Sequence, residues 1–355
     1  MPNPVLTRAI DALASRTDLS SAEAEQVLSE IMHGEASEAQ IAAFLIALRT
    51  KGEAVEELVG LARAMRALAT GVPSARENLL DTAGTGGGLR TFNVSTTAAL
   101  IAAGAGCAVA KHGNRSATSS SGSADVLEAL GARIDLDAAG VAACLDETGF
   151  GFMFAPAHHR ATRFVVPVRR ELAVRTIFNM LGPLTNPAGA RRQLIGVSDP
   201  DLILKIAEAL AHLGVDRALV VSSEDGLDEI SVAAPTSVVE VNGEKIVRYT
   251  LTPEELGFTP ADRAVMEREC AGGTPEQNAQ RTRAILDAGS AGEGSVSADL
   301  ALINAGAAIY AAGAADSVPD GVEAARQAIA DGRAASALDG YVRISRSLAP
   351  VEAAG

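Results

Sequence analysis

The chain has 355 residues, of which 48% are hydrophobic and 21% charged, a composition typical of a globular protein of about two domains and not of a disordered one. The formal net charge of −14 argues against sequence-independent nucleic-acid binding, which depends on Lys and Arg at phosphates, but it permits a small phosphorylated ligand at a local basic cluster. Cys107, Cys144 and Cys270 have neither disulfide nor zinc spacing, so we expect a reducing, cytoplasmic environment. The N-terminus lacks the apolar stretch of a signal peptide, and the longest apolar run, 98–110, is shorter than the roughly 20 residues of a membrane span, so no membrane association is expected.

Residues 1–72 are predicted to form a small helical domain. Apolar residues recur there at helical spacing, for example from Ile41 to Met65, and short polar turns separate the periodic stretches. The expected capping and stop signals are Ser20 with Glu23, Ser37 with Gln40, Gly52 and Gly71.

The pattern changes near residue 79, where short apolar runs begin to alternate with helical stretches. We expect strands at 79–83, 107–110, 133–136, 151–154, 193–197 and 218–221, and helices at 95–103, 123–130, 138–147 and 200–213. Such alternation predicts parallel βαβ units, and Asn242-Gly243 predicts the turn of a hairpin formed by 238–241 and 245–249. The predicted fold class is α/β: a small N-terminal helical domain, joined in space by about 165–190, plus a larger α/β domain (73–355) with a mainly parallel central sheet flanked by helices.

The loop after the first strand is the first candidate for chemistry. Gly84-Thr85-Gly86-Gly87-Gly88 leads through Asn93 to Ser95-Thr96-Thr97 at a predicted helix start. Glycines let backbone amides approach an anion, and a helix N-terminus adds partial positive charge. An ordinary tight turn is an equally good interpretation, because the spacing matches neither a Walker A loop nor a dinucleotide-binding loop.

A second cradle is predicted after the next strand. Lys111-His112-Gly113-Asn114-Arg115 places two cations at the carboxyl end of a parallel strand, the edge at which open α/β sheets bind ligands. The polar run Ser119–Ser123 follows and opens a helix that carries Asp125 in its first turn. Two such cradles after successive strands favour a phosphate site over a solvated turn.

Two further clusters are weaker in isolation. Asp228-Glu229 suits Mg²⁺, which takes oxygen ligands, although a solvated acidic turn explains it equally simply. The arginine stretch suits carboxylate binding, with a salt-bridged helix face near Glu171 as the alternative. It comprises Arg163, Arg169, Arg170 and Arg175. His158-His159 has the wrong spacing for a helical zinc pair.

Taken in order, these segments resemble the anthranilate phosphoribosyltransferase family, from the N-terminal helices to about residue 345. The motifs are Gly84-Thr85-Gly86-Gly87, Asn93-Val94-Ser95-Thr96, Lys111-His112-Gly113-Asn114-Arg115, Ser121-Gly122-Ser123-Ala124-Asp125, Val168-Arg169-Arg170-Glu171-Leu172, Arg175-Thr176-Ile177-Phe178-Asn179, Gly182-Pro183-Leu184-Thr185-Asn186-Pro187 and Asp228-Glu229. The resemblance implies an Mg²⁺-dependent enzyme, homodimeric through its helical domain, that transfers a phosphoribosyl group from phosphoribosyl pyrophosphate (PRPP) to the amine of anthranilate in tryptophan biosynthesis.

The resemblance also implies roles for individual residues. PRPP would be held by Gly84, Gly87, Thr91, Asn93, Ser95, Thr96, Lys111 and Ser123. The anthranilate path would be lined by Gly84, His112, Asn114, Arg169, Gly182 and Pro183. Mg²⁺ would be held by Ser95, Asp228 and Glu229. The residues expected to carry the reaction are Lys111, Arg169, Asp228 and Glu229.

The chemistry of such a transfer needs neither a nucleophilic residue nor a strong catalytic base, and the sequence offers no clear candidate for either. Displacing pyrophosphate from the ribose builds charge on both fragments, so electrostatic stabilisation and positioning matter more than a nucleophile. An aromatic amine is already unprotonated at neutral pH, and neither a nucleophile elbow nor an obvious catalytic base is present.

The glycine loop departs from the family pattern. The family usually has an aspartate after Gly87, whereas Gly88 follows directly here and the loop is one residue shorter. That aspartate normally helps to organise the PRPP and Mg²⁺ region, so we hypothesise an active enzyme that closes this loop differently. Two other interpretations stay open: a pyrimidine-nucleoside phosphorylase-like enzyme, and a non-catalytic nucleic-acid-binding relative of the same fold.

Overall fold

The computed structural model describes residues 1–116, 120–287 and 294–348, so Ser119 of the predicted second cradle lies outside the described residues. Its strands are β1 (Leu80–Gly84), β2 (Val109–Gly113), β3 (Phe150–Phe154), β4 (Arg192–Gly196), β5 (Arg217–Ser223), β6 (Thr236–Asn242) and β7 (Lys245–Leu251). Its α-helices are α1 (Pro4–Ala14), α2 (Ser21–Met32), α3 (Glu38–Lys51), α4 (Val55–Ala67), α5 (Val94–Gly104), α6 (Ser123–Ala129), α7 (Ala138–Thr148), α8 (Ala155–His158), α9 (Val166–Leu172), α10 (Phe178–Leu181), α11 (Ile203–His212), α12 (Arg263–Glu269), α13 (Pro275–Asp287), α14 (Val296–Ala312), α15 (Val318–Ala330) and α16 (Arg333–Ser347). None of the helices within these ranges is long and apolar enough to cross a membrane.

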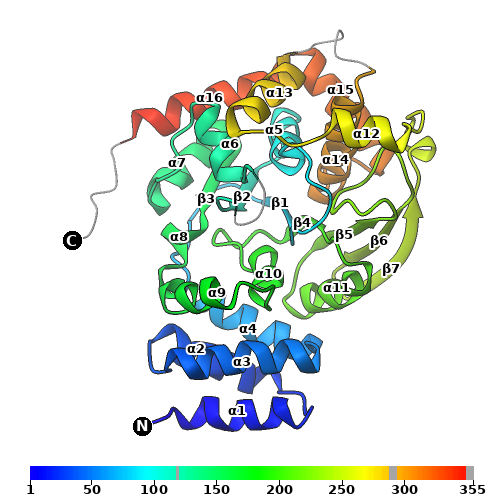
Figure 1. Ribbon diagram of the computed structural model, residues 1–355. Coiled ribbons are helices and arrows are strands. Elements are labelled where there is room, and N and C mark those ends of the chain that lie inside the picture. Colours follow the sequence, from blue (N-terminus) through cyan, green and yellow to red (C-terminus); the bar gives the residue numbers. More distant parts are fainter. Residues whose placement is uncertain (117–119, 288–293, 349–355) are drawn as a thin grey trace.

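Helices α1–α4 form the N-terminal helical layer (Figure 1). Ser20 and Glu23 make the expected capping box at the start of α2. Ser37 caps α3, but the Gln40 carboxamide oxygen accepts from the Asn3 amide instead of closing a second box. Gly52 ends α3 at φ 90° as predicted.

The expectation that Gly71 stops a helix is wrong. The last helical residue of α4 is Ala67, and Leu68 is its C-cap. The chain then becomes extended, because the Thr70 amide donates to the His158 carbonyl at 2.8 Å and the Val72 amide to the Pro187 carbonyl at 3.1 Å. Contacts distant in sequence, rather than a glycine, therefore determine how the chain leaves the helical layer.

A seven-stranded sheet, ordered β3-β2-β1-β4-β5-β6-β7, forms the centre of the molecule. The first five strands in that order are parallel, and the predicted hairpin adds β6 and β7 antiparallel to them. The strand expected at 133–136 is wrong: no ladder includes it among the described residues. The Arg133 amide donates to the Ser345 hydroxyl at 3.1 Å, so α16 takes the place of a neighbouring strand.

The sheet is buried on both faces except at the edge strand β7, and its alternation assigns neighbouring side chains to two separate cores. Leu194 and Leu219 belong to the core on the α5 and α14 face. Ile195 and Val220 belong to the second core, which also contains α1–α4, α11 and apolar residues between 165 and 184. Figure 1 shows α14 to α16 on one side of the sheet and α11 on the other. The helical layer thus shares a continuous core with one face of the sheet.

A buried ion pair fixes the junction between α3 and α4. Glu57 is fully buried and accepts from Lys51 at 3.0 Å, from the Ala54 amide at 2.7 Å and from the Leu19 amide at 3.0 Å. A buried carboxylate needs such donors because burial without partners is costly. Glu57 therefore ties three segments of the helical layer together.

Ala173, at the C-terminus of α9, adopts the left-handed conformation at φ 52°. That conformation costs an L-residue with a Cβ about 1–2 kcal/mol, more than the entropy that glycine adds to the unfolded chain. We expect Ala173→Gly to raise the free energy of unfolding by about 0.5–1 kcal/mol in urea titrations. Ala324→Gly, in the middle of helix α15, is the matched control and should lower it by about 1 kcal/mol. A loss of stability in both variants would contradict this interpretation of Ala173.

Candidate active site

The candidate site lies where the strand order changes direction. β1 lies between β2 and β4, so the loops that leave the carboxyl ends of β1 and β4 turn away from each other, which opens a crevice at that edge. A cleft of about 480 Å³ occupies this position. All the residues predicted for the site line it except two. Lining residues are Gly84, Asn93, Ser95, Thr96, Lys111, His112, Asn114, Ser123, Arg169, Gly182, Pro183, Asp228 and Glu229.

The two exceptions are Gly87 and Thr91. Gly87 lies in the glycine loop against the Arg175 side chain, and Thr91 pairs as an isolated bridge with Ala271. Both belong to the segment between β1 and α5, in which the lining residues Gly86 and Asn93 also lie.

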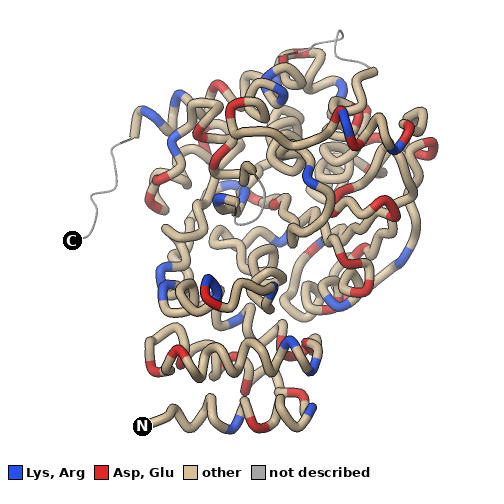
Figure 2. Tube along the Cα trace, in the orientation of Figure 1, with Lys and Arg blue, Asp and Glu red and all other residues tan. Residues whose placement is uncertain are grey.

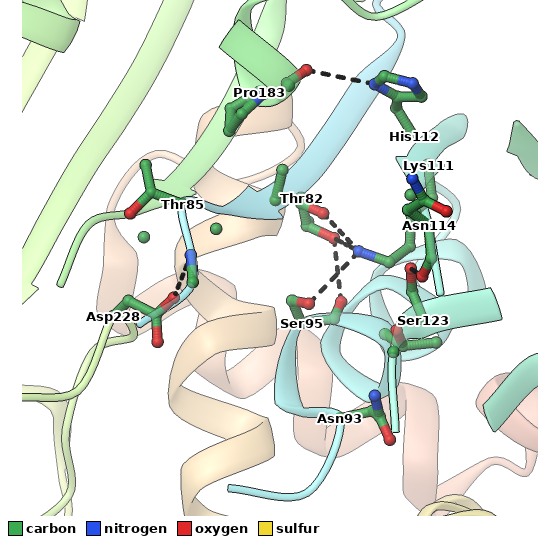
Figure 3. A pocket seen from close by; sticks show the side chains of 18 of the residues that line it. Thr82, Thr85, Asn93, Ser95, Lys111, His112, Asn114, Ser123, Pro183 and Asp228 are labelled. Carbon is green, nitrogen blue, oxygen red and sulfur yellow. Dashed lines mark hydrogen bonds between the residues drawn. The ribbon is translucent and has the colours of Figure 1, made fainter. Parts of the chain in front are cut away.

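Lys111 is the central cation of the cleft and is only 2% exposed. Its Nζ donates to the Thr82 carbonyl at 2.5 Å and lies 3.4 Å from Ser95 Oγ (Figure 3). Burial lowers the pKa of Lys111 to about 8, and the nearby Asp81 and Glu229 carboxylates partly offset that effect. No ion pair of the described residues involves Lys111, which leaves its charge available to a phosphate group.

Asp228 and Glu229 form the acidic wall of the same cleft. Burial raises the pKa of Glu229 well above its usual range, and the neighbouring Asp228 and Asp225 add to the shift. Burial also raises the pKa of Asp228. Glu229 Oε2 is buried and has no hydrogen-bond partner among the described residues. A carboxylate pair with an unpartnered oxygen is typical of a site that receives a cation.

Asp228 and Glu229 can reach the cleft only because Gly196 has no side chain. A Cβ on Gly196, the last residue of β4, would lie 1.5 Å from the Asp228 carbonyl oxygen. Only glycine therefore allows the Asp228 segment to pass over the end of β4 and reach the cleft. The described residues contain no cluster of three or more His, Cys, Asp or Glu side chains suited to a metal, so a cation here needs other oxygen ligands as well.

The two anion cradles are joined by an amide network. Asn93 Oδ1 accepts from Asn278 Nδ2 at 2.9 Å and from Ser121 Oγ at 3.1 Å, and Asn93 Nδ2 donates to the Ser121 carbonyl. Asn278 comes from α13 and accepts from the Gly273 amide at 2.8 Å. Asn93 therefore holds the start of α5 close to the start of α6.

The opposite wall carries His112 and Arg169. The His112 ring lies 3.2 Å from the Gly182 carbonyl through Nδ1, and burial followed by the nearby His159 lowers its pKa to about 3. The neutral ring donates from Nδ1, so its buried Nε2, which has no partner in the described part of the chain, is an acceptor. Arg169 stacks on the Phe178 ring at 5.2 Å and has no ion pair among the described residues. This wall thus offers a cation next to an aromatic ring.

The alternative of a salt-bridged arginine face does not hold for the described residues, because no ion pair includes Arg163, Arg169, Arg170 or Arg175. Figure 2 shows basic residues in and around α9. The stretch therefore adds uncompensated positive charge to an acidic molecule.

Sequence reasoning assigned no role to several residues that support the site. Asp81 is fully buried and accepts from the His112 amide at 3.1 Å and from Asn186 Nδ2 at 2.7 Å. Asn186 also donates to the Ala110 carbonyl, so this pair ties β1 and β2 to the segment after α10. An Asp inside an apolar run was a usable signal for Asp81, whereas nothing local marks Asn278.

Comparison with known proteins identifies the family. Residues 76–335 match the glycosyl transferase family a/b domain, and residues 7–69 match the helical bundle domain of that family. Anthranilate phosphoribosyltransferase of Rubrobacter xylanophilus is 50% identical over 347 residues, which cover 97% of this chain and 99% of that protein. The chain belongs to the anthranilate phosphoribosyltransferase family. The expectation drawn from the motifs is confirmed.

Solved structures of anthranilate phosphoribosyltransferases agree with the fold. The Thermus thermophilus enzyme superposes with a TM-score of 0.88 at 44% identity, covering 95% of this chain and 99% of that one. The Saccharomyces cerevisiae enzyme, solved in complex with PRPP and Mg, gives 0.86 at 27% identity, covering 97% and 98%. The predicted fold class, a small helical domain plus an α/β domain, is confirmed.

Buried neutral histidines make the stability of the protein pH-dependent. Burial lowers the pKa of His159 from 6.5 to about 4, and its Nε2 lies 3.1 Å from the Thr185 carbonyl. The unfolded chain takes up this proton below about pH 6.5 and the folded chain only below about pH 4, so stability falls as the pH drops through that window. We expect His159→Gln to reduce the loss of unfolding free energy between pH 7.5 and 5.5 by about 1.4 kcal/mol.

Urea unfolding at both pH values measures this difference. His33→Gln, at an exposed position, is the control and should keep the full loss of the unmodified protein. Equal losses in His159→Gln and in the unmodified protein would contradict the assignment.

Proposed function

We propose that this protein transfers the 5-phosphoribosyl group of PRPP to the amine of anthranilate and releases pyrophosphate, a step of tryptophan biosynthesis, in the cytoplasm. One observation carries the proposal: a single cleft holds a buried lysine beside two anion cradles, an acidic pair, and an arginine stacked on an aromatic ring. These features match a phosphorylated donor at one wall and an aromatic carboxylate at the other. The relatives of about 50% identity carry the name of this activity.

The donor side would be held by the two cradles. Amides at the start of α5, the Ser95 and Thr96 hydroxyls and Ser123 would bind phosphate and ribose oxygens, since Ser95, Thr96 and Ser123 line the cleft. Lys111 would balance the negative charge that develops on the departing pyrophosphate, because no described carboxylate forms an ion pair with it. Its hydrogen bond to the Thr82 carbonyl fixes Nζ before substrate arrives.

The residues present fit Mg²⁺. Asp228, the unpartnered oxygen of Glu229 and the Ser95 hydroxyl supply oxygen ligands only, and Mg²⁺ usually takes one or two carboxylates and completes its shell with phosphate oxygens and water. When bound, it would supply positive charge that stabilises the leaving pyrophosphate. The small number of protein ligands then means that metal and donor bind together.

The acceptor side would use the opposite wall. Arg169, which pairs with none of the described carboxylates, would bind the carboxylate of anthranilate, and Phe178, stacked on that guanidinium, would hold it in place. Gly182, Pro183 and Asn114 would shape the path to the ribose. The His112 Nε2 acceptor would receive a hydrogen bond from the amine N–H.

The domain division at about residue 72 and a homodimer through the helical part complete the proposal. The extended segment after α4 supports that division, and the second core supports the packing of 165–190 on α1–α4. Exposed apolar side chains Ile46, Val166 and Val174 gather on α3 and around α9. A hollow of about 450 Å³ lies between these two helices. Such a surface suits a second copy of the chain.

A fluorescence assay tests the activity. Anthranilate fluorescence should disappear only with both PRPP and Mg²⁺, and EDTA should abolish the loss. Asp228→Asn should raise the Mg²⁺ concentration for half-maximal rate about tenfold or more, whereas Asp201→Asn, on the surface, should not. Loss of fluorescence in EDTA would contradict the metal site, and phosphate-dependent cleavage of thymidine would favour the phosphorylase alternative.

Sedimentation measures the assembly. We expect a dimer at micromolar concentration, and Ile46→Glu should weaken it by roughly 100-fold, because a buried unpaired carboxylate is costly. Val247→Glu changes a similarly exposed apolar residue on β7 and should leave the dimer intact. A monomeric unmodified protein would refute the homodimer.

A further inference from the structure

Arg175, one member of the arginine stretch to which no individual role was given, reaches the glycine loop. It lies in the turn between α9 and α10, and its Nη1 donates to the Gly86 carbonyl at 2.8 Å. The Ser198 hydroxyl donates to the same oxygen at 2.9 Å. The Gly86 carbonyl is thus held by a cation and a hydroxyl from two segments outside the loop.

The amide of Gly86 is held from the other side. It donates to Asp228 Oδ2 at 3.1 Å. Asp228 and Arg175 therefore bind the two polar groups of one residue, and each meets a partial charge opposite in sign to its own. This contact fixes the loop between the α/β domain and the α9–α10 segment.

The contacts of Gly86 with Arg175, Ser198 and Asp228 restrict the conformation of the glycine loop that follows. Gly86 and Gly87 adopt φ values of +65° and +96°, and a Cβ on Gly87 would lie 1.7 Å from Arg175 Nη1. Among the described residues, no backbone hydrogen bond uses the amides of Gly87 or Gly88. Consecutive free amides in such a turn form a concave binding site for anions.

The position of Gly88 shows why the shortened loop has no room for the aspartate that the family usually carries after Gly87. A Cβ on Gly88 would approach Asp228 Oδ1 to 2.8 Å, so a carboxylate at this position would be forced against another carboxylate. The shortened loop instead packs directly on Asp228 and is held by the Arg175 cation. Arg175 also partly offsets, through its charge, the rise in the pKa of Asp228.

Arg175 is itself anchored. Its carbonyl accepts from Arg49 of α3 at 2.9 Å, and the following amide, that of Thr176, donates to Asn179 Oδ1 at 3.0 Å. Arg170, on the preceding helix, is exposed and makes no ion pair with a described residue. The two arginines therefore differ in contacts while sharing charge and neighbourhood.

We propose that Arg175 is a positioning residue for the phosphorylated donor: it holds the shortened glycine loop so that the Gly87 and Gly88 amides face the pyrophosphate group. The identity of the donor rests on the proposed function, but the contact between Arg175 and the loop does not. Removing the guanidinium leaves the Gly86 carbonyl with the Ser198 hydroxyl as its remaining donor. This loosens the peptide and lets it rotate, which disperses the two amides.

Steady-state kinetics test the proposal. Arg175→Gln should raise the KM for PRPP about tenfold, the value expected for a charge-assisted hydrogen bond, with the KM for anthranilate and the Tm unchanged. Arg175→Lys should recover part of the loss, and Arg170→Gln should match the unmodified enzyme. A KM for PRPP within about twofold of the unmodified enzyme, or equal rises for both substrates, would overturn it.

Hydrogen exchange separates this inference from the proposed function. Without any substrate, amides of residues 85–92 should exchange at least about fivefold faster in Arg175→Gln than in Arg170→Gln or the unmodified protein. Inorganic pyrophosphate with Mg²⁺ should bind about tenfold more weakly to Arg175→Gln in calorimetry. Unchanged exchange overturns the loop contact even if the enzyme is active, whereas an inactive enzyme with faster exchange overturns only the transferase proposal.

Discussion

The organisation of the site depends on one constraint, the burial of the Lys111 ammonium at the carboxyl edge of a parallel sheet. A buried cation needs acceptors, and the Thr82 carbonyl and hydroxyl of the adjacent strand provide them. Asp81 provides a nearby opposite charge, but its oxygens accept from the His112 amide and from Asn186. The lysine thus stays charged and oriented without a direct ion pair to a described residue.

Polar contacts of the same kind link segments that lie far apart in the chain. Asn186 ties the segment after α10 to β2, Asn278 ties α13 to the start of α5, and Arg175 ties the α9–α10 turn to the glycine loop. The Asn186 bond is buried and the Asn278 bond partly buried, and burial makes hydrogen bonds both stronger and costlier to lose, whereas the Arg175 bond is exposed and gains from its charge. Together they bring the wall that carries Arg169 against the wall of the sheet that carries Lys111.

The cleft contains charged groups of both signs that form no ion pair in the part of the chain that the structure describes. The molecule is strongly acidic overall, yet the stretch around α9 presents arginines without carboxylate partners among the described residues (Figure 2). In the same cleft as Arg169, burial raises the pKa of both Asp228 and Glu229, and the neighbouring Asp228 adds to the rise for Glu229. Unpaired cations and crowded carboxylates are both unfavourable in the free protein, and each is relieved by a ligand of opposite charge.

Local patterns were sufficient for much of the architecture. The alternation of apolar runs predicted five of the six single strands and the hairpin, because strands buried on both faces read as continuous apolar segments. The pattern failed at 133–136, where a segment of alternating apolar and charged residues packs against α16 without a ladder among the described residues. It also failed at Gly71, because the helix ends earlier and the chain instead contacts His158 and Pro187. The periodicity of apolar residues predicts which side chains are buried. It does not predict which neighbouring segment forms hydrogen bonds with the backbone.

By itself, the sequence determined the fold class, the family and the residues of the cleft, since glycine loops, cations and carboxylates at strand ends are local features that the parallel topology gathers at one edge. Only the tertiary structure decided which of them meet. Asp81, Asn278 and Arg175 act on residues 31, 185 and 89 positions away, and no periodic pattern encodes such pairings. Their partners are set by the packing of helices and loops around the sheet, where the need to satisfy each buried polar group selects one arrangement.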